Sequence, residues 1–327
     1  MYRRTRKISK FVAVLTWLAV SAPLVHAGMD EEFPAQSIRI VVPFPPGGST
    51  DSIARALADG LTRELGEMVY IDNRPGASTN IGADWVTKAR ADGYTLLFGG
   101  SALMVNAIFG PKPAFVPHEA LQPISMVAEV PFVLVVHANA PFQTAKAFLE
   151  AAQSDPGKYS IASAQLETYV EKWKLAAHIN LLHVPYKGGA QAVTDVIAGQ
   201  VDATFALVPV LLPQIQSGKL RALGISSTQR LVSSLPDVPT FTESGIDFRT
   251  TVWYGLQAPA GIDPERLSKL NKATRKVVAA PEFVARLADA GARASGSTPE
   301  AMGQMLEKQR LAWERLATRQ PQLIQGK

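Results

Sequence analysis

The chain has 327 residues, of which 47% are hydrophobic and 8% aromatic, a composition typical of a globular protein long enough for two domains. Its formal net charge of +5 does not indicate a nucleic-acid or anionic-membrane partner, because five of the 33 basic residues and no acidic residue lie in the first ten positions. Without those five, 28 basic residues face 28 acidic ones. The lack of cysteine excludes disulfides, thiolate metal sites, Cys nucleophiles and a lipid-anchored N-terminal Cys.

The first 27 residues have the pattern of a secretory signal peptide. Basic "MYRRTRKISK" is followed by apolar "FVAVLTWLAV" and then by "SAPLVHA", with Val25 and Ala27 at the positions that signal peptidase reads. An uncleaved anchor is the alternative, but the apolar core of about 10 residues is half of the roughly 20 that a membrane span needs. We therefore expect cleavage after Ala27 and a soluble mature protein in the periplasm.

From Ser37 onward, short β-rich runs alternate with helical segments, a pattern typical of a parallel α/β sheet. The predicted strands are 38–42, 68–71, 95–100, 132–137, 159–163, 181–186, 201–207 and 221–226. The predicted helices are 49–65, 80–90, a third element from Ser101, 144–153, 166–179, 189–199 and 210–217. The order of these elements predicts two successive α/β units.

A crossing strand at 251–261 is followed by predicted helices only, at 264–279, 281–290 and 298–319. Because a helical tail without a strand must pack on a sheet already made, we expect these helices to return to the first lobe. The chain then crosses between lobes near 128–131 and 250–256, which predicts a hinge and a cleft. We expect lobe 1 to comprise 28–128 and 255–327, and lobe 2 to comprise 129–254.

The stretch "VVPFPPGGSTDSIARAL" (41–57) leads a buried strand through Gly47 and Gly48 into a helix. Unpaired N–H groups and the helix dipole make such a helix start a binding site for anions, and Ser49 and Thr50 add hydroxyl donors. The stretch lacks the Lys of a nucleotide P-loop, the dinucleotide glycine spacing and the G-x-S-x-G of a nucleophile elbow. The alternative is an ordinary capped helix, with Ser49, Thr50 or Asp51 as N-cap.

The stretch "HVPYKGGAQAV" (183–193) repeats this construction in the second unit, with Gly188 and Gly189 opening a helix. Two such helix starts, one in each lobe, would face each other at the carboxyl ends of the strands, where open α/β sheets bind ligands. This pair suits a small carboxylate, with Tyr186 and Phe44 as walls of the pocket. Lys187 is either a counter-ion for the ligand or a solvated side chain.

Six stretches in order resemble the extracytoplasmic solute receptors of tripartite tricarboxylate transporters, the Bug-type receptors. They are "IRIVVPFPPGGSTDSIARALADGL", "DNRPGASTNIGADWVTKARADGYTLLFG", "LLHVPYKGGAQAVTDVIAGQVDATF", "GKLRALGISS", "LPDVPTFTESG" and "WYGLQAPAG". The resemblance covers nearly all of the mature chain. It implies an α/β periplasmic-binding-protein fold, type II-like, with two lobes that are each a mostly parallel sheet flanked by helices, closing on a small carboxylate.

The resemblance also implies which residues hold the ligand. In the family, the loops corresponding to Phe44 through Asp51 and to Tyr186 through Ala190 hold one carboxylate from opposite lobes, largely through backbone groups and ordered water. Ser78, Thr79, Asn80 and Ser101 would complete the first lobe's surface. The candidates in the second lobe are Ser163, Ala164, Gln165, Thr168 and Leu207.

The sequence departs from the family's pattern in the second lobe. After "YSIAS", Gln165, Glu167 and Thr168 stand where small, donor-rich residues are expected. A Glu167 facing the cleft would repel a second carboxylate and favour a cationic or neutral group, whereas the alternative is a first-turn acid that complements the helix dipole. The run "FALVPVLLP" (205–213) is apolar where the family often has a polar residue, so the distal half of the pocket is less suited to a dicarboxylate.

No catalytic or metal site is expected. The histidines at 118, 137, 178 and 183 are scattered without metal-ligand spacing, and Asp51 has no partner that would make it a general base. We therefore expect a monomeric, non-enzymatic receptor without cofactor or metal, which passes its ligand to the membrane permease of a tripartite transporter. The alternatives are a periplasmic sensor that feeds a signalling membrane protein, and, more remotely, a secreted hydrolase.

Overall fold

A computed structural model describes residues 32–164, 167–186 and 188–324. The chain divides into two units, residues 1–33 and residues 34–327, and the fold below is that of the second unit. The expected signal peptide, Gln165 and Lys187 lie outside the described residues. Within the described ranges, no helix combines the length and apolar character needed to cross a membrane.

The N-terminal segment forms three parallel strands, as the sequence predicted. β1 (Ile38–Val42) lies between β2 (Val69–Asn73) and β3 (Thr95–Gly100). One helix follows each strand, namely α1 (Ser49–Leu65), α2 (Asn80–Thr87) and α3 (Ser101–Phe109). Since the carboxyl ends of parallel strands lie at one edge of a sheet, the helix starts after β1 and β3 share that edge.

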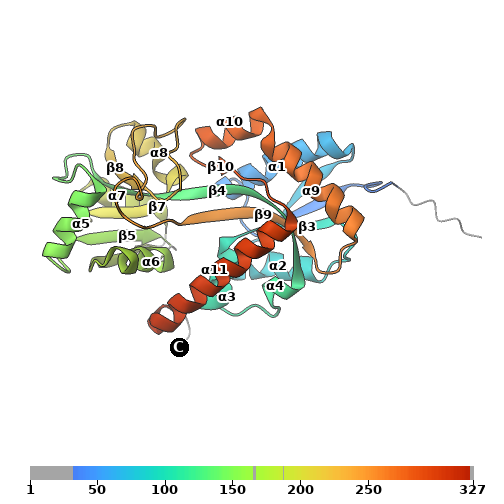
Figure 1. Cartoon of the computed structure of the whole chain (residues 1–327), viewed down its shortest axis with the longest axis horizontal. Helices are drawn as coiled ribbons and strands as arrows, with labels where there is room; N and C mark the ends of the chain where they lie inside the picture. The colour runs from blue at the N-terminus through green and yellow to red at the C-terminus, as the bar shows by residue number, and fades with distance from the viewer. Residues whose placement is uncertain (1–31, 165–166, 187, 325–327) are drawn as a thin grey trace, which may run out of the picture. The chain divides into compact units, whose positions relative to one another are not determined.

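The strand β4 (Leu121–His137) is much longer than the predicted strand 132–137. Its first part, through Pro131, pairs antiparallel with β9 (Thr251–Pro259), and the two strands lie side by side in Figure 1. From Phe132 onward it pairs antiparallel with β7 and β8 instead. The pairing partner of this single strand therefore changes between Pro131 and Phe132.

The second group of strands surrounds this distal part of β4. Its strands are β5 (Ser160–Ala164), β6 (Leu182–Tyr186), β7 (Ala203–Leu207) and β8 (Leu220–Ile225), with parallel β5–β6 and β5–β7 pairs. Its helices are α5 (Ala145–Ser154), α6 (Glu167–Ala177), α7 (Gly189–Ile197) and α8 (Val208–Gln216). The sheet order β2-β1-β3-β9-β4-β7-β5-β6 is thus parallel toward both ends and antiparallel in the centre.

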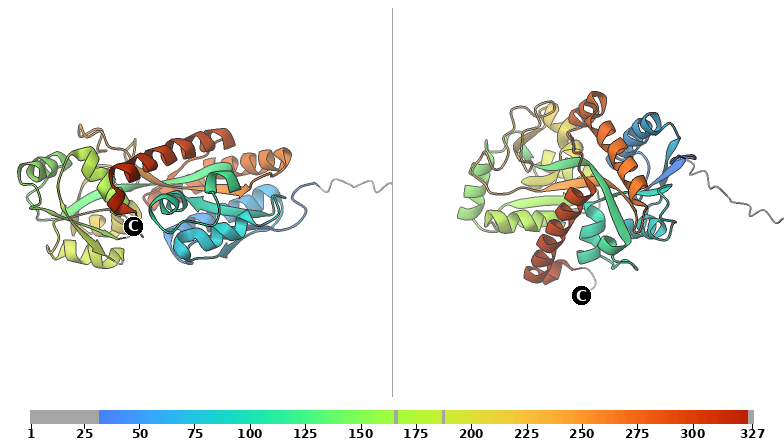
Figure 2. Two further views of the ribbon diagram at one scale, coloured as in Figure 1. Left: turned by 90° about the horizontal axis from the view of Figure 1, so that it is seen from below. Right: turned by 45° about the vertical axis from the view of Figure 1, so that its right-hand side comes forward.

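The C-terminal segment adds α9 (Pro264–Ala279), α10 (Pro281–Asp289), α11 (Pro299–Arg319) and the 3-10 turn Pro321–Leu323, while the short α4 (Pro117–Ala120) precedes β4. Helix α9 packs on α1 and β4, and α11 packs on α3 and β4; both views of Figure 2 show α11 in red. The expectation of a tail without a strand is wrong, because β10 (Arg293–Ala294) pairs antiparallel with β4. A two-residue strand has too little sequence to show a period.

Buried aromatic rings form the core beside the second group of strands. Phe205 on β7 stacks on Phe132 of β4 with ring centroids 4.8 Å apart, and on Trp173 of α6 at 5.4 Å. All three side chains are fully buried. These contacts fix the position of α6, whose first turn enters the candidate site described next.

Candidate functional site

A cavity of about 950 Å³ is lined by residues from both groups of strands. The loop after β1, the loop after β2, one face of α3 and β9 contribute from one group. The first turn of α6, the start of α7, and β7 contribute from the other. A cavity of this size is within the range of small-molecule sites.

Helix α1 begins beside this cavity, and Gly48 is its N-cap, with an extended φ of −81°. An ordinary capped helix would have Ser49, Thr50 or Asp51 as its N-cap. None of these three is the N-cap, because the helix already begins at Ser49. The first helical bond runs from the Ser52 amide to the Gly48 carbonyl, so the N–H groups of residues 48–51 have no acceptor within the helix. Phe44 lines the cavity and Gly47 and Gly48 are exposed.

Asp51 is buried and holds the glycine turn in place. Its Oδ2 accepts from the Gly47 amide at 3.0 Å and from Arg55 Nε at 2.9 Å, and its Oδ1 accepts from Asn73 Nδ2 at 2.9 Å. Burial alone would raise the pKa of Asp51, but the hydrogen bonds from Arg55, Gly47 and Asn73 outweigh it and lower this pKa to about 2. Gly47 has a φ of +87°, which favours glycine, and the hydrogen bond from its amide to Asp51 stabilises this turn.

Thr50 links the start of α1 to β9. Its Oγ1 donates to the Tyr254 hydroxyl at 2.9 Å, and both groups are buried. The ring of Tyr254 lines the cavity and stacks on Phe98, with centroids 5.7 Å apart. Burial raises the pKa of Tyr254, so its hydroxyl stays protonated at neutral pH. Thr50 therefore positions a cavity wall without itself lining the cavity.

The loop after β2 is strained where it meets the cavity. Ala77, Ser78 and Thr79 have φ angles of 45°, 54° and 79°, in the left-handed region that costs energy for residues other than glycine. Asn106 of α3 braces the loop by donating from Nδ2 to the Ser78 carbonyl at 2.7 Å. Thr79 is buried and lines the cavity, and its Oγ1 has no hydrogen-bond partner in the described part of the chain. Strain and an unsatisfied hydroxyl at one residue are features of a ligand-binding loop.

On the opposite side, Glu167 and Thr168 in the first turn of α6 line the cavity together with Ala164 and Gly189. Glu167 is half-buried, and within the described ranges it forms no ion pair. The two interpretations of Glu167 are therefore compatible, because it is both a first-turn acid and a cavity residue. Its carboxylate gives this side of the cavity a negative charge.

Tyr169 of α6 extends the same wall toward the other group of strands. Burial raises the pKa of its hydroxyl, although a hydrogen bond with the Ser101 side chain opposes this shift. Its ring meets Trp313 of α11 edge-on, with centroids 4.9 Å apart. The ammonium of Lys172, one turn further along α6, lies 4.7 Å from the Trp313 ring centre. Helix α6 is thus held against α11 close to the cavity.

Two predicted serines do not line the cavity, because their hydroxyls serve the framework. Ser101 is buried, and its Oγ accepts from the Trp253 amide at 2.9 Å. Ser163 is buried as well, and its Oγ lies 2.8 Å from His183 Nε2. Burial lowers the pKa of His183, so this imidazole is neutral at neutral pH.

Tyr186 and Asn80 are also placed outside the cavity lining. The Tyr186 hydroxyl donates to Asp195 Oδ2 at 2.6 Å, and this hydrogen bond raises the pKa of Tyr186 to about 12. Asn80 Nδ2 donates to the Pro111 carbonyl at 3.1 Å. Tyr186 thus ties the end of β6 to α7, and Asn80 ties the start of α2 to the segment after α3.

The predicted residues therefore divide into groups. Those that line the cavity are Phe44, Ser78, Thr79, Ala164, Thr168, Gly189 and Leu207. Those near it but outside its lining are Gly47, Gly48, Ser49, Thr50, Asp51, Asn80, Ser101, Ser163, Tyr186, Gly188 and Ala190. Lining residues that the sequence did not indicate include Asn106, Tyr169, Val252, Tyr254 and Gln322.

The described residues contain no group of three or more His, Asp or Glu side chains that could hold a metal ion. The described lining thus combines hydroxyls, two side-chain amides, aromatic rings, apolar side chains and one carboxylate, with the start of α1 beside it. Such a set binds and orients a small polar molecule.

Comparison with known proteins identifies the family. The model of the tripartite tricarboxylate transporter family receptor matches residues 53–320. The chain belongs to this family. It is 35% identical over 302 residues to protein BugT of Bordetella pertussis, an alignment that covers 90% of this chain and 92% of BugT. The resemblance inferred from the sequence motifs is therefore confirmed.

Solved structures of this receptor family share the fold. Rpa4515 of R. palustris, solved with adipate, is 29% identical, with a TM-score of 0.74 and coverage of 88% of this chain and 98% of that one. MatC of Rhodopseudomonas palustris, solved with bound malate, is 27% identical, with a TM-score of 0.69 and coverage of 87% and 99%. The expected two-lobed α/β fold of a solute-binding receptor is thus confirmed, in the form of a mixed sheet.

Proposed function

We propose that this receptor binds a small carboxylate in the 950 Å³ cavity and delivers it to the permease of a tripartite transporter. The observation that carries the proposal is that Phe44, Thr79 and Gly189 line one cavity, although they lie far apart in the sequence. Helix starts at α1 and α7 supply N–H groups that favour an anion. Two relatives were solved with carboxylates, adipate in one and malate in the other, which supports a carboxylate as the ligand.

The ligand's second end is proposed to be neutral or cationic. Glu167 and Thr168 lie on the wall formed by α6, and Leu207 and Val210 make the adjoining surface apolar. A second carboxylate there would meet the charge of Glu167 across a partly desolvated space, which costs affinity. A monocarboxylate with an amide, a hydroxyl or an amino group at its far end avoids that repulsion.

The lobe division proposed from the sequence is supported by the strand pairing. The proposed boundaries at 128/129 and 254/255 lie close to the point where β4 exchanges β9 for β7 and β8. A strand with different partners in its two parts is a suitable hinge for closure around a ligand. We propose that closure brings the helix starts of both lobes onto one carboxylate.

Export and the absence of catalysis are part of the same proposal. The basic, apolar and small-residue segments of 1–27 support cleavage after Ala27 and a periplasmic location. We propose binding without turnover: among the described lining residues, Glu167 is the one carboxylate and no histidine or lysine stands beside it. N-terminal sequencing of protein exported with its own leader is expected to begin at Gly28; a retained leader would contradict the export proposal.

The ligand test starts with protein released gently from the periplasm and analysed by native mass spectrometry. We expect a one-to-one complex that loses a carboxylic acid on activation. After ligand removal, titration calorimetry compares that acid with its primary amide, which has nearly the same shape without the charge. The amide is expected to bind at least about tenfold more weakly. Equal affinities, or a natural ligand without a carboxylate, would contradict the proposal.

The choice between transport and sensing is made in cells. A strain that lacks the receptor gene is compared with one that carries it for uptake of the radiolabelled acid. Loss of uptake on deletion supports delivery to a permease. Unchanged uptake together with lost transcriptional response to the acid would instead assign the receptor to a sensor.

A further inference from the structure

A second cavity, of about 490 Å³, lies behind the wall of the first. The strand β9 separates the two, because successive side chains of a strand point to opposite faces. Val252 and Tyr254 line the carboxylate cavity, whereas Trp253 and Gln257 line the second one. Helix α3 divides in the same way, so the two cavities are different sites with a shared wall.

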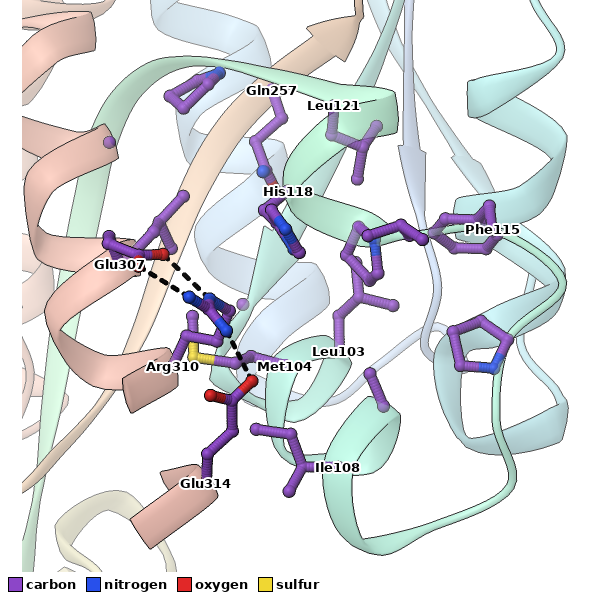
Figure 3. Close-up of a pocket in the computed structure, with 18 of the residues that line it drawn as sticks. Leu103, Met104, Ile108, Phe115, His118, Leu121, Gln257, Glu307, Arg310 and Glu314 are labelled. Carbon is purple, nitrogen blue, oxygen red and sulfur yellow. Dashed lines mark hydrogen bonds and ion pairs between the residues drawn. The ribbon is translucent and has the colours of Figure 1, made fainter. Parts of the chain in front are cut away.

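The second cavity is mostly apolar, and the buried amide of Gln257 is one of the polar groups that line it. Leu103, Met104, Ile108 and Phe115 surround the space, and Figure 3 shows them around its interior. Gln257 extends into the same space from β9. Apolar walls with few polar groups are typical of small-molecule sites.

Gln257 is the polar group that needs a partner. Its side chain is only 5% exposed, and its Oε1 has no hydrogen-bond partner among the residues that the structure describes. Gly99 on the neighbouring strand makes room for it, because a Cβ at that position would collide with the Gln257 amide oxygen. A buried amide oxygen that lacks a partner costs folding free energy. A ligand hydroxyl in the cavity, which both donates and accepts, would pair with this amide once its side chain turns Oε1 from Gly99 toward the cavity.

Gly303 keeps the cavity open from the side of α11. It lies in the interior of that helix, where glycine is less favourable than alanine. Nothing lies within 4 Å of the Cβ that an alanine would place there, so neither a close contact nor a left-handed φ requires glycine. Since Gly303 lines the cavity, the missing side chain adds space to it.

Arg310 lines the cavity but is already paired with two carboxylates, which argues against an anionic ligand. Arg310 donates to Glu307 at 2.6 Å and to Glu314 at 2.5 Å, and Figure 3 shows the guanidinium held between these two carboxylates. The exposed side chains of Lys112 and His118 line the cavity as well. An anion would therefore find Arg310 already neutralised, in contrast to the helix starts of the first cavity.

We propose that the second cavity binds a small uncharged molecule with a hydroxyl group on an apolar, ring-sized body, such as a phenol. The apolar body would pack against the side chains of α3, Phe115 and Leu306, and the hydroxyl would pair with the Gln257 amide. This site is independent of the proposed carboxylate site and is tested separately.

The test uses 2-naphthol as the probe and the methyl group of Met104 as the reporter. The full mature receptor is labelled with ¹³C-methyl methionine and titrated while methyl spectra are recorded. We expect a saturable ring-current shift of the Met104 signal and no shift of the exposed Met68, which does not line the cavity. 2-Naphthoate, which has a similar size and a negative charge, is expected to bind at least about tenfold more weakly.

Two variants and one control locate the probe. Gly303→Phe fills the cavity from α11 and should abolish the Met104 shift, whereas the control Gly303→Ala should retain it. Gln257→Leu should weaken 2-naphthol at least about fivefold and leave naphthalene, which lacks the hydroxyl, unchanged. An unsaturable shift, preference for 2-naphthoate, or unchanged binding in Gly303→Phe would overturn the proposal. If Gln257→Leu does not fold, the two Gly303 variants still decide it.

Discussion

The ammonium of Lys172 lies 4.7 Å from the centre of the Trp313 ring and 3.3 Å from Thr250 Oγ1. Burial lowers the pKa of Lys172 to about 8. A cation–π contact and one neutral hydrogen bond thus replace only part of the hydration that the ammonium loses. Below pH 8 Lys172 is charged in the folded protein, so its burial costs free energy of folding.

Replacing Lys172 with methionine should therefore stabilise the fold. Lys172→Met keeps an unbranched chain over Trp313 and is expected to raise the free energy of unfolding by about 1–2 kcal/mol at pH 7. Between pH 8 and 10.5 the unfolded chain binds more protons at position 172 than the folded one, so the stability of the wild type rises with pH there. Urea unfolding should show a smaller difference in the free energy of unfolding between Lys172→Met and the wild type at pH 10 than at pH 7. A difference that is constant with pH would contradict the assigned pKa.

Asp51 has the opposite effect on stability, because its folded-state pKa of about 2 is below the ordinary 3.8. Its stabilisation is present above about pH 4 and is lost as the pH falls toward 2. Asp51→Asn is expected to cost about 1–2 kcal/mol at pH 6 and roughly a third of that near pH 2.5. Urea unfolding across this range measures the difference, with Asp59→Asn on the same helix as the control. A cost that does not change with pH would show that the charge of Asp51 is not what matters.

Thr79 provides a test in which stability and affinity change in opposite directions. Thr79→Val preserves shape and β-branching but removes the buried hydroxyl that has no partner among the described residues. The ligand-free protein is expected to be unchanged or more stable by about 1 kcal/mol. Affinity for the carboxylate ligand should fall about tenfold, as calorimetry would show, if that hydroxyl pairs with the ligand. Unchanged affinity would exclude Thr79 as a ligand contact.

Glu167 should determine which acids bind. Glu167→Gln removes the negative charge on the α6 wall, and affinity for adipate is expected to rise about fivefold or more. Hexanoate, which has one carboxylate and the same chain length, should change much less. Comparing both ligands by calorimetry on wild type and variant separates charge repulsion from a change of shape. An equal change for both acids would contradict the proposed placement of the second carboxylate.

The helices and the edge strands could be predicted from the sequence because local signals specify them. The apolar spacing of α1 and the Pro and Gly residues around it gave its bounds, Ser49–Leu65, without error. The long strand β4 could not be predicted in full. Pro123 and Pro131 lie inside it and normally argue against a central strand, but register shifts at its pairing with β9 accommodate an irregular ladder.

The candidate site was predicted only where the backbone defines it. Phe44 and Gly189 were found because glycine loops before helices are visible in a sequence. Ser101 and Ser163 were expected to line the pocket from the resemblance to the family, but a sequence does not show which way a side chain points. Tyr169 and Tyr254 were missed because an aromatic residue in an amphipathic helix or in a strand is ordinarily a core residue.

The central claim is that the helix starts of α1 and α7 together hold one carboxylate in the 950 Å³ cavity. Gly48 and Gly188 are the N-caps of these helices, and both have an extended backbone conformation. A Cβ at either position would meet nothing within 4 Å. The double variant Gly48→Val, Gly188→Val should therefore fold while its side chains obstruct the helix starts.

The decisive measurement is the shift in Tm that the co-purified carboxylic acid produces. Wild type and the control Gly303→Ala should show the same ligand-induced rise, whereas the double variant should melt near the ligand-free wild type and show no rise. An equal rise in Tm for the double variant would contradict the claim that these two helix starts bind the ligand.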